Sequence, residues 1–337
     1  MTRQTTIDSY RVLRISACFG IVILHSLFAC EVYFKGSLTQ GQILYSGLFE
    51  HLLMWCVPCF LLITGALLLD PEREVPLSKL FGKYMRRMVL ALVVFTFIFR
   101  ALDVMAGEKD GLVSGFFRDL FFGESGAHMW YLYLMIGIYF MMPVYRAASE
   151  KLSDKTMQYI IAVLVVFTSV LPALESFGLP LAFYIPTSLV YPAYIFLGYY
   201  IHNHKMDRAL ALLLLVGCTA VLVLLSFLRA GGVSYAEGLD QLFGYSSPLI
   251  LGQSCGVFGL FDRMDVKNLP AFWQSADRCT FGIYLIHMIF IHWMFKWAGV
   301  DPYTIGAWIF PAAAVLFFLV SFAITWCIRK IPKANLL

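Results

Sequence analysis

Ten long apolar runs, joined by short polar connections, constrain this chain more than any other feature. Of its 337 residues, 60% are hydrophobic, which is more than a soluble domain usually carries. A helix of about 20 apolar residues crosses a bilayer and satisfies its own backbone hydrogen bonds there. The sequence therefore predicts an all-α, polytopic membrane protein with about ten transmembrane helices in one bundle. The predicted spans are 12–30, 47–69, 86–106, 128–146, 157–174, 184–202, 209–228, 243–261, 279–297 and 304–328.

The connections between these runs are too short to form a separate soluble domain, so residues 1–337 are expected to be a single transmembrane domain. The first run follows basic residues, as a signal peptide does, but no small-residue cleavage site follows it, which favours a retained helix. The Gly-rich segment 107–127 contains FFRDLFF, which indicates a short interfacial helix. Four glycines in the eighth run are expected to permit close helix packing.

The distribution of basic residues predicts the orientation. With ten spans, 19 of the 25 Lys and Arg residues fall at the two termini and in alternate loops, all on one side of the membrane. The positive-inside rule places that side, with both termini, in the cytoplasm. The location expected is the cytoplasmic membrane of a bacterium, with lipid as the surrounding partner.

Charge and cysteine content exclude several classes of function. The net charge is +4 and the cations are scattered through short loops, so no nucleic-acid partner is expected. The eight cysteines lie mostly within apolar runs, where small buried side chains are the simplest interpretation. His202 and His204 are expected to be solvated and lack further ligands, so no metal is expected.

Two ionisable residues in the first run are the leading candidates for chemistry. Eleven residues separate Arg14 from His25, or roughly 16 Å of helix, about half of a bilayer core. Arg14 would lie near the cytoplasmic interface, where snorkelling to headgroups is an alternative role. His25 would lie near mid-depth. An ionisable group at that depth faces a bundle interior or a cavity, and a plain helix–helix contact is the alternative.

The ninth span contains a second candidate pair. Tyr284 and His287 lie three residues apart on one helix face, and His287 should reach a depth comparable to that of His25. Both could instead do no more than hydrogen-bond neighbours within the bundle.

Further candidates lie at the ends of the spans. His128, Trp130 and Tyr131 open the fourth span and are expected to form an aromatic belt at the outer membrane surface. Glu50 and His51 also fall at the outer face and could help to bind a polar acceptor. A basic cluster enters the third span from inside. It would suit an anionic phosphate ligand, although a solvated topogenic role is the default. This cluster comprises Lys83, Arg86 and Arg87.

Together these segments resemble the acyltransferase 3 family of membrane O-acyltransferases, in order and over nearly the whole chain. Arg14 and His25 match the Arg-x10-His motif of the first helix. VPCFLLITGALLL is similar to V-P-x-F-F-x-I-S-G-x-L, with Thr64 in place of serine. HMWYLYLMIGIYFMMP resembles the H-x-W-y…P segment and FGIYLIH the late Y-x-x-H helix. The short form, without an appended soluble domain, most resembles the enterobacterial common antigen O-acetyltransferase type.

The resemblance implies transfer of an acyl group, usually acetyl from acetyl-CoA as co-substrate, to a hydroxyl of a sugar or glycan outside the cytoplasm. Arg14 and the cluster Lys83, Arg86 and Arg87 would bind CoA phosphates. His25 would act as general base, with Tyr284 and His287 orienting the acceptor or the base. A dry bundle keeps the imidazole neutral and able to accept a proton. An acyl-histidine intermediate is the alternative to direct transfer.

A different class of function also fits the same residues. A permease or flippase could use His25 and His287 as a proton relay for a polar or lipid-linked substrate. A purely structural membrane protein would not need histidines at mid-depth. Release of free thiol from acetyl-CoA separates the enzyme from the transporter.

Overall fold

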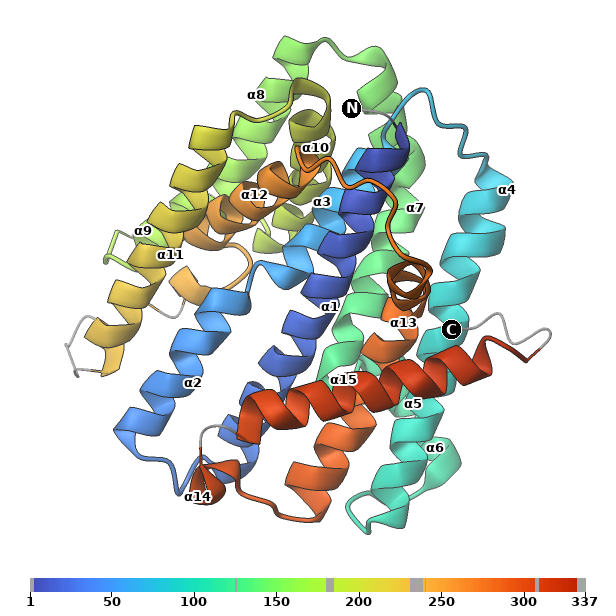
Figure 1. Ribbon diagram of the computed structural model, residues 1–337, viewed down its shortest axis with the longest axis vertical. Coiled ribbons are helices and arrows are strands. Elements are labelled where there is room, and N and C mark those ends of the chain that lie inside the picture. Colours follow the sequence, from blue (N-terminus) through green and yellow to red (C-terminus); the bar gives the residue numbers. More distant parts are fainter. Residues whose placement is uncertain are drawn as a thin grey trace.

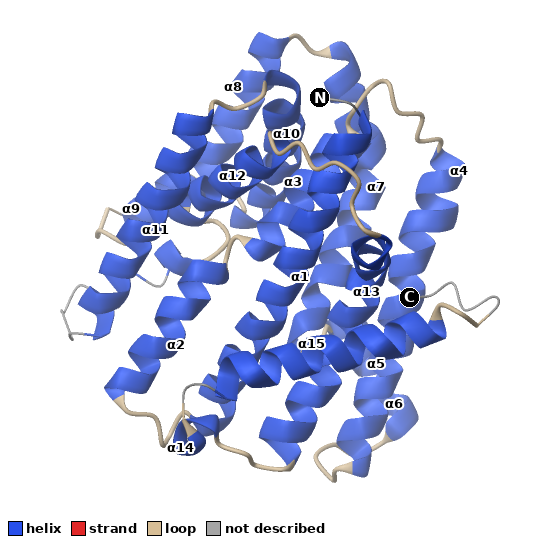
Figure 2. Cartoon of the chain, viewed as in Figure 1, coloured by secondary structure: helices blue, strands red, loops and turns tan. Residues whose placement is uncertain are grey.

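The structure is a computed structural model that describes residues 3–124, 126–179, 185–230, 239, 241–306 and 309–331. Within these ranges every regular element is a helix, and no strand occurs (Figure 1, Figure 2). The all-α prediction is therefore confirmed. The α-helices of the first half are α1 (Arg3–Phe34), α2 (Gln40–Leu53), α3 (Cys56–Leu68), α4 (Leu77–Lys79), α5 (Arg86–Met105), α6 (Leu112–Phe122) and α7 (Trp130–Lys151).

The second half continues in the same way, with shorter helices between the long ones. Its α-helices are α8 (Asp154–Val165), α9 (Leu171–Glu175), α10 (Val190–His204), α11 (Arg208–Ala230), α12 (Pro248–Asp262), α13 (Ala271–Ile291), α14 (Pro302–Ile305) and α15 (Ile309–Ile328). Three π-helical segments continue or precede α-helices: η1 (Leu80–Met85), η3 (Val166–Val170) and η6 (His292–Trp297). Two 3-10 turns, η2 (Ala127–Met129) and η4 (Thr187–Leu189), lead into α7 and α10.

Eight helical stretches of the described chain are long and apolar enough to cross a membrane, and the protein is a multi-pass membrane protein. They correspond to eight of the ten predicted spans. The predicted spans 184–202 and 243–261 contain α10 and α12, which have only 15 residues each. At about 1.5 Å per residue each is about 22 Å long, less than the roughly 30 Å of a hydrocarbon core.

The short helices pack closely inside the bundle because glycines face their neighbours. A β-carbon on Gly65 of α3 would lie 1.9 Å from the Ile195 carbonyl oxygen, and one on Gly198 of α10 would lie 2.0 Å from that of Leu62. In α12, a β-carbon on Gly256 would lie 2.6 Å from the Ala211 carbonyl oxygen of α11. The expectation that glycines in the eighth predicted span permit close packing is confirmed for Gly252, Gly256 and Gly259, whereas Gly244 lies before α12 and makes no close contact.

The connections alternate between two ends of the bundle. Figure 1 shows the N-terminus, the loop before α4 and the α7–α8 and α10–α11 connections at the top, and the α1–α2 loop, α6 and α14 at the bottom. We call the first the basic end, because it carries the residues that the positive-inside count places in the cytoplasm. The predicted interfacial helix in 107–127 is present as α6, at the opposite end.

Helix α1 forms the axis of the molecule. One hydrophobic cluster joins it to α3, α7, α10 and α12, and a second joins it to α5, α13 and α15. In Figure 1, α15 crosses α1 and α13 obliquely and covers them on one side. The face of α1 that points between α7 and α13 is therefore enclosed by helices, and this is where the candidate site lies.

Candidate active site

One face of α1 carries a cation, two small apolar groups and a histidine. Arg14, Cys18 and Ile21 line the same internal cavity, at intervals of four and three residues. His25 follows four residues after Ile21, so it lies one helical turn beyond the lined part of the cavity. The predicted order of arginine near one end and histidine deeper in the bundle is therefore present on a single helix face.

Arg14 is paired with an acid that sequence reasoning did not select. Its guanidinium donates from Nε to Oδ1 of Asp277 at 2.6 Å and from Nη2 to Oδ2 at 3.0 Å. Nε of Arg11 lies 3.7 Å from Oδ2 of the same carboxylate. Two parallel hydrogen bonds fix the plane of the Arg14 guanidinium, which a headgroup-seeking arginine would not require.

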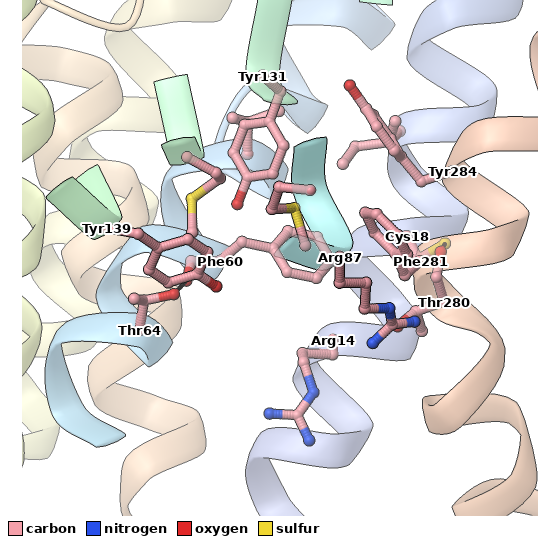
Figure 3. A pocket seen from close by; sticks show the side chains of 14 residues that line it. Arg14, Cys18, Phe60, Thr64, Arg87, Tyr131, Tyr139, Thr280, Phe281 and Tyr284 are labelled. Carbon is pink, nitrogen blue, oxygen red and sulfur yellow. Dashed lines mark hydrogen bonds between the residues drawn. The ribbon is translucent and has the colours of Figure 1, made fainter. Parts of the chain in front are cut away.

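The inner cavity has a volume of about 200 Å³ and is polar mainly at its ends (Figure 3). Arg14 and Arg87 lie at the basic end. Tyr131 and Tyr284 lie at the other end, each one helical turn along its helix from a histidine, His128 and His287 respectively. The wall between them is mostly apolar, formed by Cys18, Ile21, Val57, Phe60, Met88, Met135 and Phe281. A cavity of this kind suits a narrow, mostly apolar chain with a charged head.

Arg14 also faces a larger vestibule of about 730 Å³ at the basic end. Basic and acidic side chains line the vestibule, and they come from α1, α10, α13 and the connections after α3 and α10. Its ionisable residues are Arg11, Arg14, Asp70, Glu72, Arg73, His202, Lys205 and Asp277. Arg14 is thus the residue shared by the vestibule and the inner cavity, and it marks the passage between them.

His25 and His287 form a hydrogen-bonded pair. Nδ1 of His25 lies 2.8 Å from Nε2 of His287, and the rings are nearly parallel, with centroids 5.1 Å apart. Nδ1 of His287 lies 3.0 Å from the Ile283 carbonyl oxygen, which can only accept, so this nitrogen donates. With both rings neutral, Nε2 of His287 is then an acceptor, and Nδ1 of His25 must donate to it.

This arrangement sets the tautomer of His25. Its proton sits on Nδ1, so Nε2 keeps a lone pair, and no described residue hydrogen-bonds to that atom. The side chain is half-buried rather than sealed. A neutral imidazole with one nitrogen fixed by a partner and the other free is the arrangement that a general base requires.

His128 joins the pair as a third imidazole. Its ring centroid lies 6.1 Å from that of His25 and 5.9 Å from that of His287. The Tyr284 hydroxyl donates to the His128 backbone carbonyl. His128 is only 2% exposed, so the prediction that it belongs to a belt at the membrane surface is wrong. His128 is enclosed because α1, α5 and α13 surround the start of α7, where the rings of His25, Phe99 and Tyr284 pack against it.

The other predicted site residues lie at varying distances from this cluster. Tyr131 is in the wall of the inner cavity, whereas the Trp130 ring packs against Tyr191 and Tyr245. Of the predicted phosphate-binding cluster, Arg87 lines the cavity and places its guanidinium 4.4 Å from the centre of the Phe281 ring. Two members are exposed on the helix surface and line none of the cavities described here, namely Lys83 and Arg86.

Glu50 and His51 lie on the other side of α1. They line a separate pocket of about 260 Å³ near the end opposite to the basic end, between α1, α2 and α11. Nδ1 of His51 lies 2.7 Å from the Ser226 hydroxyl, and Oε1 of Glu50 is buried without a hydrogen-bond partner. Figure 1 shows α2 and α13 on opposite sides of α1, so this pocket and the histidine cluster are separated by that helix.

His202 is only partly solvated: its side chain is 24% exposed toward the vestibule and is held by an ion-pair network. Its Nδ1 lies 2.6 Å from Oδ1 of Asp262, which is fully buried and also accepts from Tyr10 at 2.5 Å. Lys205 completes the charge balance at 2.8 Å from Oδ2 of Asp262. This network ties α1, α10 and α12 together beside the vestibule. Its acid and its tyrosine are far from His202 in the sequence, so spacing alone could not reveal them.

The described helices thus form a membrane bundle whose inner cavity begins at a paired arginine and ends one helical turn from a hydrogen-bonded histidine pair. The model of the acyltransferase 3 family, described as "Acyltransferase domain", matches residues 7–330. The chain belongs to this family and is a membrane acyltransferase that acts on a hydroxyl. No curated protein and no solved structure matches the chain.

Proposed function

We propose that this acyltransferase takes an acetyl group from cytoplasmic acetyl-CoA and transfers it to a hydroxyl of a sugar or glycan outside the cytoplasm. The resemblance to the enterobacterial common antigen type supports a lipid-linked or polymeric glycan as acceptor, in the inner membrane of a bacterium. The observation that carries the proposal is the single α1 face on which Arg14, at the mouth of an apolar cavity, leads to His25.

The donor enters from the basic end. The nucleotide and phosphates of CoA occupy the vestibule, where Arg14, Arg11 and Arg73 offer guanidinium groups to phosphate oxygens. The mostly apolar inner cavity accepts the pantetheine arm, with Arg87 at its entrance. Lys83 and Arg86 are exposed beside this entrance and act on phosphate groups outside the cavity. In this arrangement the thioester reaches the turn of α1 that carries His25.

The chemistry requires one base and no metal. Nε2 of His25 takes the proton of the acceptor hydroxyl while the hydroxyl oxygen attacks the thioester carbonyl carbon. The new carbon–oxygen bond forms, and the carbon–sulfur bond then breaks. The departing thiolate takes the proton from the His25 imidazolium, which yields the acetyl ester, free CoA thiol and neutral His25. His287 holds Nδ1 of His25 throughout, and its bond strengthens when His25 is charged.

The acceptor approaches from the opposite end. The attacking hydroxyl meets Nε2 of His25 next to the packed rings of His128, Tyr284 and His287, and Trp130 lies one residue from Tyr131. Glu50 and His51, in their separate pocket across α1, reach only a part of the acceptor that extends away from the reacting hydroxyl. A glycan with several sugars is long enough to do this, whereas a single free sugar is not.

The test is release of free thiol from acetyl-CoA by the purified protein in detergent, with a panel of lipid-linked sugars, glycans and free sugars as acceptors. We expect thiol release that depends on one class of acceptor, with the acetyl ester recovered in equal amount. Protein that binds or moves a glycan but releases no thiol with any acceptor would contradict the proposal and favour the transporter.

A further inference from the structure

The inner cavity ends at two tyrosines that differ in the state of their hydroxyls. Tyr284 uses its hydroxyl, which donates to the His128 carbonyl. Figure 3 shows this hydroxyl directed away from the cavity, whereas that of Tyr131 is directed toward the other lining residues. No hydrogen bond to a described residue uses the Tyr131 hydroxyl. Tyr131 is therefore a free donor held inside an enclosed cavity.

The position of Tyr131 along α7 places this donor at the reacting end. Tyr131 follows three residues after His128 and precedes Tyr139, another cavity-lining residue, by eight. Eight residues correspond to about 12 Å of helix. Tyr139 therefore lies toward the entrance, and Tyr131 beside the histidines. Its ring is fixed there against Tyr284, with centroids 5.8 Å apart, and against Trp130, at 6.0 Å.

The other polar groups near the cavity cannot supply a hydrogen bond at this point. The Thr64 hydroxyl donates to the Phe60 carbonyl at 2.7 Å, and the two arginines lie at the entrance. Both ring nitrogens of His128 are buried, and His128 does not line the cavity. A ligand with a carbonyl at the histidine end would meet Tyr131 as its donor. An apolar ligand group would leave the hydroxyl unpaired, at a cost in binding.

We infer that the Tyr131 hydroxyl donates a hydrogen bond to the carbonyl oxygen of the bound acyl thioester, and that this bond stabilises the oxyanion formed during transfer. The inference rests on the proposed function. When the acceptor oxygen adds to the carbonyl carbon, the π electron pair moves to the carbonyl oxygen, opposite the Tyr131 O–H. The pair returns as the carbon–sulfur bond breaks, so Tyr131 keeps its proton throughout. A fixed donor of this kind acts most strongly in a dry site.

The test compares Tyr131→Phe with Tyr145→Phe, which removes a hydroxyl from the same helix at a residue that lines neither the inner cavity nor the vestibule. We expect Tyr131→Phe to lower kcat by about 10²–10³, as loss of an oxyanion donor commonly does, with an unchanged melting temperature in detergent. Tyr145→Phe should stay within a few-fold of the wild type. Since a structural role could also lower kcat, binding supplies the second readout.

Binding of acetyl-CoA is compared with that of S-ethyl-CoA, a thioether without the carbonyl oxygen. The wild type and Tyr145→Phe should bind the thioester more tightly than the thioether, and Tyr131→Phe should lose this preference. If the wild type is active and Tyr131→Phe is equally active, the inference is wrong and the proposed function stands. The same holds if Tyr131→Phe still binds the thioester more tightly than the thioether. A wild type that releases no thiol from acetyl-CoA with any acceptor would overturn the proposed function and this inference with it.

Discussion

Two hydrogen-bonded pairs of side chains lie at the two ends of the cavity, and each pair suits a different step. Arg14 is held by Asp277 at the entrance, where a charged head would bind, and His25 is held by His287 where a proton would move. In both pairs the second residue fixes the orientation of the first and leaves part of it free. The pairs join α1 to α13 at two levels, so shifting either helix would disturb both.

The two histidines are expected to differ in how much their loss lowers kcat. His25→Ala should lower kcat by about 10²–10⁴, the usual cost of losing a general base, with acetyl-CoA still bound. His287→Ala should cost less, and His287→Gln less again, because the glutamine oxygen can accept from Nδ1 of His25. Steady-state thiol release and donor binding measure both effects. A folded His25→Ala enzyme with near wild-type turnover beside an inactive His287→Ala enzyme would exchange the two roles.

The arginine pair predicts an effect on donor affinity. Arg14→Lys should raise the KM for acetyl-CoA, because an ammonium cannot keep two parallel bonds to Asp277 and still offer a flat donor edge to phosphate. Asp277→Asn should raise the same KM with a smaller effect on kcat. Arg118→Lys, at the opposite end and 68% exposed, is the matched control. An unchanged donor KM in both entrance variants would leave the pair as a helix–helix contact.

Single residues also show where prediction from sequence ends. The depth of His25 and His287 could be predicted because depth follows from helical rise. Asp277 could not be selected, since it lies 263 residues from Arg14 and resembles an ordinary acid at the end of a span. Tyr131 was assigned to the surface because aromatic residues at a span end usually lie there. The sequence does not reveal that α1, α3 and α13 surround that end and leave Tyr131 inside.

At the level of elements, the short helices depend on glycine. Hydropathy identified the runs that contain α10 and α12, but apolar content cannot distinguish a full span from a helix of 15 residues inside the bundle. The difference arises from packing: α10 and α3 approach until backbone touches backbone, at Gly65 and Gly198. Two membrane-spanning helices with larger side chains could not approach so closely.

This contact predicts a large effect from one methyl group. Gly198→Ala would place a β-carbon 2.0 Å from the Leu62 carbonyl oxygen, and backbone cannot yield as a flexible side chain can. We expect a loss of about 1–3 kcal/mol or more, seen as a lower melting temperature in detergent. Gly137→Ala in α7 is the control, since nothing lies within 4 Å of its added carbon. Equal melting temperatures for the two variants would contradict the close contact.

For the whole molecule, alternation of the connections agrees with the distribution of basic residues, and the side each end faces stays a prediction. Cysteine at Ala106, in the exposed connection before α6, should react with an impermeant maleimide in intact cells. Cysteine at Glu74, at the basic end, should react only after permeabilisation. Cys327→Ser is the background for both, because Cys327 is the exposed cysteine among those described. The reverse labelling pattern would invert the topology and place the donor outside.

The inner cavity also bears on the insulation of the membrane. In the proposed function, two substrates approach from opposite ends and meet inside a protein that separates two compartments at different electrical potential. The passage is mostly apolar, holds only about 200 Å³ and ends at the paired rings of Tyr131 and Tyr284. A hydrated ion would have to shed its water against such walls, at a prohibitive cost. In the proposed function the group that crosses is a neutral acetyl, which carries no such cost, so its transfer would leave the electrical potential across the membrane intact.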